Sequence, residues 1–162
     1  MVRHGWAVGV LLLALPGPAG SAAAAQAGAT MAIKVEVLAP PCAVSDAALD
    51  FGTYTSGQLA PLDGSAEVSF AGCGPGVVTL ELDGGQSGDQ DARHLGNSGA
   101  SLGYGLFQDA ARTRTFGTGS SAASLTLADQ SAGHFTVYGR IPAHQTAAAG
   151  AFTDTVNMTL AF

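Results

Sequence analysis

Short runs in which apolar and polar residues alternate recur along most of the chain. One of them occupies residues 154–162, where every second residue is large and apolar: Val156, Met158, Leu160 and Phe162. This period of two residues is typical of a strand with one face in a core. Similar runs predict strands at 31–38, 47–54, 66–73, 77–83, 102–108, 124–129, 134–142 and 154–162. Turn residues separate them at intervals of about 8 to 12 residues, a spacing typical of all-β sandwiches.

Two stretches of the chain do not fit this pattern. Residues 143–152 are rich in alanine but lack an apolar stripe. Because Pro142 and Gly150 bracket this alanine-rich stretch, we expect a loop. Residues 83–103 are polar and glycine-rich, and we expect a solvated loop there as well. The acids Asp83, Asp89 and Asp91 do not have the spacing of a known calcium loop, so no metal site is expected.

The first 25 residues have the composition of a secretory signal peptide. Arg3 precedes an apolar run from Trp6 to Leu15, and Pro16 and a tail of small residues follow, with Ala25 as the expected cleavage position. The apolar run has about ten residues, whereas a membrane-spanning helix needs about 20. We therefore expect export rather than membrane anchoring, and a mature chain that begins near residue 26.

Charge and cysteine content narrow the class of protein further. Loss of Arg3 from 6 basic residues leaves 5 against 12 acidic ones, a formal net charge of −7. An acidic chain with scattered basic residues is a poor ligand for nucleic acid. Cys42 and Cys73 are the two cysteines, and in an oxidising compartment we expect them to form one disulfide. Their loop of about 30 residues would stabilise the fold by roughly 3 to 4 kcal/mol.

The sequence carries no recognisable catalytic motif. It lacks a G-x-S-x-G nucleophile elbow, an H-E-x-x-H zinc motif and a phosphate-binding P-loop. His94, His134 and His144 are far apart in the sequence and have the positions of surface or strand-end residues. We predict that the protein is not an enzyme and needs no cofactor.

The N-terminal part of the mature chain is an amphipathic strand without an evident neighbour. Residues 31–37 place their large apolar side chains on one face: Met31, Ile33, Val35 and Val37. Pro40 and Pro41 should end any pairing there. The strand could fold back as an edge strand of its own sandwich, or it could complete the sandwich of another copy, a head-to-tail exchange that generates a fibre. The pattern alone leaves both arrangements open.

An ordered set of short motifs resembles the spore coat U domain family, which includes the subunits of archaic (Csu-type) chaperone-usher pili. The set covers residues 31–162 and consists of Cys42 to Ser45, Leu49 to Tyr54, Cys73-Gly74, Leu102 to Asp109, Phe116 to Gly119, Tyr138 to Pro142 with Gln145, and Phe152 to Val156. Phe116 stands where the family usually has tryptophan, and Phe107 where it often has tyrosine.

The resemblance implies an incomplete immunoglobulin-like β-sandwich that is completed by donor-strand exchange. It implies that residues 26–41 form the donor segment, residues 42–162 the sandwich, and Met31, Ile33, Val35 and Val37 the donor side chains. The implied acceptor groove is lined by Val156, Met158, Leu160 and Phe162 on one wall and by Leu49 and Phe51 on the other.

The resemblance also implies partners and a location. These are other copies of the subunit, a periplasmic chaperone and an outer-membrane usher, with a final place in a cell-surface fibre that serves adhesion or biofilm formation. Two other functions stay open: a spore-coat or extracellular-matrix protein with the same fold, and an adhesive binding module.

Overall fold

The computed structural model describes residues 31–36, 42–129 and 131–162. The chain divides into two units, residues 1–37 and 38–162, and each is described by itself. In the first unit, residues 31–36 have no regular secondary structure, and the side chains of Met31, Ile33 and Val35 are at least 80% exposed. The expected signal peptide at 1–25 and the side chain of Val37 lie outside the described residues.

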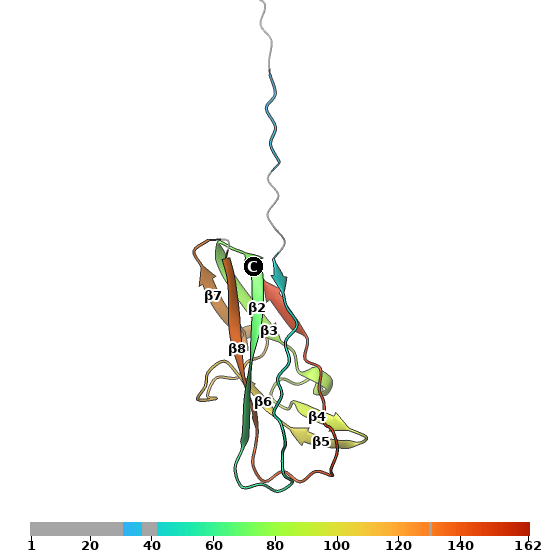
Figure 1. Cartoon of the computed structure of the whole chain (residues 1–162). Coiled ribbons are helices and arrows are strands. Elements are labelled where there is room, and N and C mark those ends of the chain that lie inside the picture. Colours follow the sequence, from blue (N-terminus) through green and yellow to red (C-terminus); the bar gives the residue numbers. More distant parts are fainter. Residues whose placement is uncertain (1–30, 37–41, 130) are drawn as a thin grey trace, which may run out of the picture. The chain divides into compact units, whose positions relative to one another are not determined.

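The second unit contains a four-stranded antiparallel sheet in the order β1-β2-β8-β6. Its strands are β1 (Ala43–Val44), β2 (Leu62–Cys73), β6 (Gly105–Phe107) and β8 (Ser131–Ile141). The two long strands, β2 and β8, lie side by side over most of their length (Figure 1). Their apolar residues face one another in register, with Val68 opposite Phe135, so one face of this sheet is apolar.

A second sheet has three antiparallel strands in the order β7-β3-β9. These strands are β3 (Gly76–Leu82), β7 (Ala123–Leu127) and β9 (Met158–Ala161). A separate hairpin of β4 (His94–Asn97) and β5 (Ala100–Gly103) projects to the right in the lower half of Figure 1. Two short 3₁₀ turns, η1 (Gly85–Ser87) and η2 (Gly119–Ser121), complete the regular elements of the described residues.

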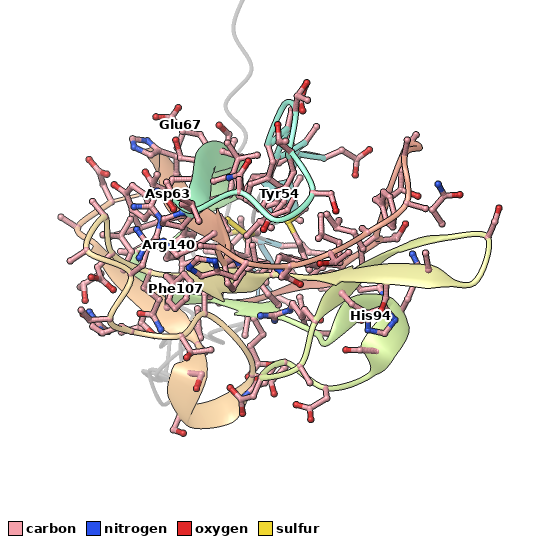
Figure 2. The ribbon with its side chains drawn as sticks, turned by 90° about the horizontal axis from the view of Figure 1, so that it is seen from below. Tyr54, Asp63, Glu67, His94, Phe107 and Arg140 are labelled. Carbon is pink, nitrogen blue, oxygen red and sulfur yellow. A yellow bond between two sulfur atoms is a disulfide. The ribbon has the colours of Figure 1, made fainter. Side chains whose placement is uncertain are left out.

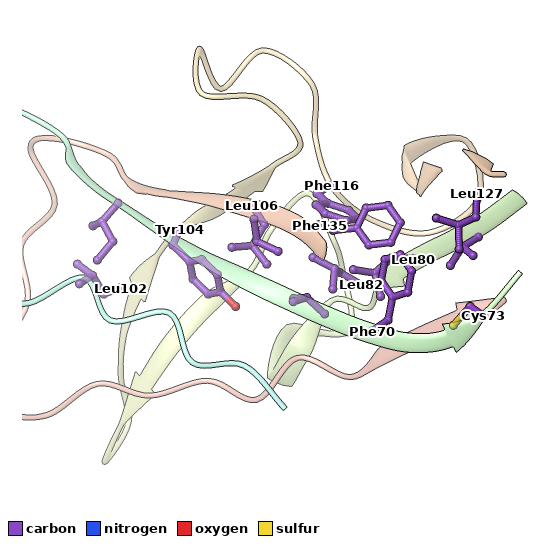
Figure 3. Close-up of a cluster of buried hydrophobic side chains, with 14 residues drawn as sticks. Phe70, Cys73, Leu80, Leu82, Leu102, Tyr104, Leu106, Phe116, Leu127 and Phe135 are labelled. Atoms are coloured by element: carbon purple, nitrogen blue, oxygen red, sulfur yellow. The ribbon is translucent and has the colours of Figure 1, made fainter. Parts of the chain in front are cut away.

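The two larger sheets bury their apolar faces against each other. Val68, Phe70, Phe135 and Val137 of the first sheet and Val78, Leu80 and Leu82 of the second belong to one buried cluster. Phe116, from the segment between β6 and β7, lies inside this cluster and is fully buried (Figure 3). This packing is that of a β-sandwich, so the predicted all-β sandwich class is confirmed.

Charged side chains are found on the outer face of the first sheet. Arg140 of β8 donates two hydrogen bonds to the carboxylate of Asp63 on β2, at 2.7 and 2.8 Å (Figure 2). Arg112 approaches the same carboxylate at 3.2 Å. The hydrogen bonds from Arg140 and the two nearby positive charges hold the pKa of Asp63 below its ordinary value, although partial burial opposes them.

The predicted disulfide between Cys42 and Cys73 is confirmed. It joins the residue before β1 to the last residue of β2, with the two Cα atoms 4.5 Å apart. The β2-β8 register shifts between Phe70 and Cys73, which is a β-bulge at the point where the chain leaves the first sheet for the second.

Three of the predicted strands are absent or only partly formed in the structure. Residues 31–36 are not a strand, because a strand exists only when its backbone groups have a partner. Residues 47–54 are also irregular, since Gly52 has a φ of 74° and its N–H bonds to the Asp50 carboxylate, which turns the chain. Only Met158–Ala161 of the predicted strand at 154–162 is paired, because its partner β3 ends at Leu82.

The expectation of a solvated loop at 83–103 is wrong for its second half. The β4-β5 hairpin forms there around Ser98 and Gly99, both of which have positive φ. Positive φ at both central residues is what a tight hairpin turn with the right twist requires. The alanine-rich residues 143–152 contain no helix, as expected.

Candidate functional site

An open groove runs between the two sheets, on the side where β1 and β9 are the edge strands. Its narrower part is a cavity of about 160 Å³, with residues 47–51 on one side and 154–158 on the other. A larger cavity of about 690 Å³ continues it toward residues 147–153. The two cavities share four lining residues: Leu49, Phe51, Leu95 and Asp154. We call this continuous space the inter-sheet groove.

The first wall of the inter-sheet groove is the segment that follows β1. Leu49 and Phe51 point inward and pack against the core. A Cβ atom on Gly139 of β8 would lie 2.6 Å from the ring of Phe51, so only glycine permits this approach. The ring of Phe51 also meets Tyr104 edge to face, with centroids 6.1 Å apart. The wall is therefore fixed by side-chain packing rather than by a strand ladder.

The second wall consists of residues 153–161. Residues with even numbers point toward the groove and those with odd numbers are exposed. Val156 and Met158 line the cavity between the walls, together with Leu49 and Phe51 of the first wall. Leu160 packs against the core cluster farther along. Phe162 does not join them, because its side chain is 74% exposed.

A polar pair interrupts the apolar lining where the two cavities meet. The hydroxyl of Tyr104 donates a 2.6 Å hydrogen bond to the Asp154 carboxylate. Burial, followed by this hydrogen bond, raises the pKa of Tyr104 well above its ordinary value, so the phenol stays protonated as the donor. The other oxygen of Asp154 accepts the backbone N–H groups of Gln86, at 2.8 Å, and Thr155, at 2.7 Å.

A buried arginine lies beneath this pair. Arg93 is 1% exposed, and its five N–H groups donate to four backbone carbonyls, those of Leu82, Asp83, Gln90 and Phe116. Burial lowers its pKa, while the nearby Tyr104, Asp83 and Asp154 oppose that effect. A buried charge with all its donors bonded can support the surrounding backbone.

Sequence reasoning missed Arg93, Tyr104 and Asp154 as parts of this site. Asp154 carried a signal, because it extends the inward stripe of Val156 and Met158 by two residues. Arg93 carried none, since it lies in a polar, glycine-rich stretch without periodicity.

The described residues contain no cluster of three or more His, Cys, Asp or Glu side chains placed to hold a metal ion. Within the same ranges, the structure has no helix of the length and hydrophobicity needed to cross a membrane. The expected donor residues Met31, Ile33 and Val35 belong to the first unit, where their side chains are exposed.

Comparisons with known proteins agree with this architecture. No curated protein matched the sequence. Among solved structures, the chain is similar to the chaperone-tip adhesion subunit pre-assembly complex CsuC-CsuE from the archaic chaperone-usher Csu pili of Acinetobacter baumannii. The identity is 20% and the TM-score 0.53, over 75% of this chain and 39% of the matched one. The chain thus spans about two fifths of that protein's length.

A second similar structure is the P pilus rod subunit PapA. Here the identity is 20% and the TM-score 0.51, over 75% of this chain and 99% of the matched one. At such identities the likeness concerns the fold alone. It supports an immunoglobulin-like sandwich fold for this chain, like that of pilus subunits.

The family relationship is established by the sequence itself. The family model described as the Spore Coat Protein U domain matches residues 27–159, which is most of the chain. The resemblance noted from the motifs is therefore confirmed, and the chain belongs to the Spore Coat Protein U domain family.

Proposed function

We propose that the protein is a structural subunit of a chaperone-usher pilus, assembled by donation of one copy's N-terminal strand to the next copy. The observation that carries this proposal is the open inter-sheet groove. An intact sandwich would fill this space with a strand, yet the described residues leave Leu49, Phe51, Val156 and Met158 lining a cavity. A core with such an opening is incomplete by the packing standard of globular proteins.

Residues 31–37 have the chemistry that would fill the groove. Their alternation presents Met31, Ile33, Val35 and Val37 on one face of an extended chain. Burial of four such side chains would contribute roughly 6 to 12 kcal/mol before the cost of ordering the strand. Each backbone hydrogen bond to a groove wall would add about 1 kcal/mol. The resulting joint between copies would be durable.

The proposal includes partners and a destination. An unfilled apolar groove needs cover during export, which a periplasmic chaperone would provide by lending a strand, and an outer-membrane usher would then exchange that strand for the next copy's. The finished product would be a surface fibre that serves adhesion or biofilm formation, and the subunit itself would have no enzymatic activity. Both solved structures to which the chain is similar come from pili.

Charge substitutions in the donor face test this function. The full chain is exported to an oxidising periplasm with its cognate chaperone, and unboiled samples are run on SDS gels. We expect a ladder of polymers from the parent chain and none from the Ile33→Asp, Val35→Asp variant. The control is Ala32→Asp with Lys34→Ala, which changes the net charge equally on the opposite face and should keep the ladder. Unchanged polymers from the donor-face variant would overturn the proposal.

A second candidate function is a coat or matrix component that uses the same sandwich without forming a long fibre. The description of the matching family model, which names a spore coat protein, favours it. Electron microscopy of the polymerising chain distinguishes the two, because a pilus subunit should give fibres of many copies and a coat component short or laterally associated species.

A further inference from the structure

Residues 153–157 are the part of the groove wall that the sheet does not support. The β3-β9 ladder stops at Met158 because β3 ends at Leu82. Before that point, Thr153 forms a backbone bridge to Gly96, and the carbonyl of Asn157 accepts the N–H of Asp83. No hydrogen bond within the described ranges involves the backbone of Val156, which lies between them. Something other than a strand ladder must hold this segment.

Side-chain carboxylates take the place of the missing ladder. One oxygen of Asp83 accepts the N–H groups of Gly85 and Asn157, both at 2.9 Å. The other oxygen accepts the side-chain amide of Asn157 at 2.6 Å. At the opposite end of the segment, Asp154 is bonded to Tyr104, Gln86 and Thr155 as described above. We call Asp83 and Asp154, with these partners, the carboxylate clasp.

Neighbouring residues pack closely around the carboxylate clasp. Gly85 has a φ of 60°, and a Cβ atom there would overlap the Asp154 carboxylate. Arg93 donates to the carbonyl of Asp83 from below and so fixes the backbone from which that carboxylate extends. Burial acts to raise the pKa of Asp83, but the hydrogen bonds from Asn157 and Gly85 outweigh it and keep this pKa below its ordinary value. Asp83 is thus ionised at neutral pH, and its carboxylate is the acceptor in the hydrogen bonds from Gly85 and Asn157.

We propose that the carboxylate clasp positions residues 153–157 for capture of the donor strand. It holds Val156 toward the inter-sheet groove and leaves the adjoining backbone free to pair with an incoming strand, here an alternating apolar strand of a second copy. Asp83 and Asp154 would act as positioning residues that determine how fast a strand is accepted. This inference rests on the proposed function.

A reciprocal exchange of two side chains tests the inference. In Asp83→Asn, an uncharged amide takes the place of the carboxylate that faces the side-chain amide of Asn157, and the charge-assisted hydrogen bond between these two side chains is lost. In the double variant Asp83→Asn, Asn157→Asp, the new amide donates to the new carboxylate, and the bond is restored with its polarity reversed. Asp129→Asn, an exposed acid outside the cavity linings, is the control with the same charge change.

All acceptors are made as full chains that carry Ile33→Asp and Val35→Asp, so that none can donate its own strand. Capture of a fluorescent peptide of residues 26–41 is followed by anisotropy. We expect Asp83→Asn to slow capture about tenfold, as the loss of one charge-assisted hydrogen bond would. The capture rate of the double variant should return to within about twofold of the parent rate. Asp129→Asn should capture the peptide as fast as the parent does. Circular dichroism melting of each acceptor reports its overall stability.

The outcomes separate the two proposals. If the parent acceptor captures peptide but Asp83→Asn captures it equally fast, the positioning role is wrong and the proposed function stands. If the double variant regains the parent's melting temperature but not its capture rate, Asp83 contributes to stability alone and the positioning role is again wrong. If the parent acceptor captures no peptide, the proposed function itself is overturned, and the inference falls with it.

Discussion

Replacement of Arg93 by methionine should strongly destabilise the sandwich. Methionine keeps much of the side-chain volume but removes all five N–H donors, which leaves the carbonyls of Leu82, Asp83, Gln90 and Phe116 without these partners. A hydrogen bond to a charged group contributes about 1.5 to 3 kcal/mol. Because the four sites are coupled and the loop can relax, these values do not add. We expect a loss of about 3 to 5 kcal/mol, less than the sum of the separate hydrogen bonds.

Urea unfolding of the chain with Ile33→Asp and Val35→Asp measures this loss without polymerisation. Circular dichroism is the suitable probe, since the single tryptophan, Trp6, lies in the expected signal peptide. Arg114→Met is the matched control, because Arg114 is exposed and bonds to one side chain, Gln108, at 2.8 Å. It should change stability by less than about 0.5 kcal/mol. A loss below about 1 kcal/mol for Arg93→Met would refute the view that this guanidinium supports the fold.

Three further predictions concern the core, the groove wall and pH. Phe116→Ala empties a fully buried site and should cost about 3 to 5 kcal/mol in urea unfolding; a loss under 1 kcal/mol would mean that the site collapses. Gly139→Ala should displace Phe51 from the first wall, and slower peptide capture with little change in β-sheet signal would show it. The folded-state pKa of Asp63 is depressed, chiefly by its hydrogen bonds from Arg140. The ionised Asp63 side chain therefore contributes its full stabilisation at pH values above the ordinary aspartate pKa of about 3.9. This stabilisation is lost as the pH falls below that value and through the folded-state pKa. Asp63→Asn should make unfolding midpoints less sensitive to pH below about 4, and an unchanged pH profile would contradict this assignment.

Much of the sandwich could be predicted from the sequence because burial on one face imposes a period of two. The runs that contain Val68, Val78 and Val137 became the long paired strands of the two sheets. The disulfide was predictable for a different reason, since two cysteines allow one pairing. In these cases the local pattern and the tertiary environment agree.

The rest depended on contacts that local patterns do not encode. Residues 47–51 alternate like a strand, but their backbone has no ladder, and packing of Phe51 over Gly139 decides their path. Arg93 lies in a segment that reads as solvated, yet it is buried because four carbonyls from separate parts of the chain converge on it. Asp154 continues an apolar stripe, and its partner Tyr104 is 50 residues away in the sequence.

The position of the disulfide has a mechanical consequence for a fibre assembled in this way. Tension along the fibre would reach the sandwich through the segment that precedes Cys42. The strand that follows Cys42, β1, has two residues and by itself would separate easily from β2. The bond to Cys73 transmits the load to the point where β2 ends and the chain passes on to β3. Both sheets then share the force as shear along long strands, so that a single-molecule pull should find a high rupture force when the disulfide is oxidised and a low one after reduction.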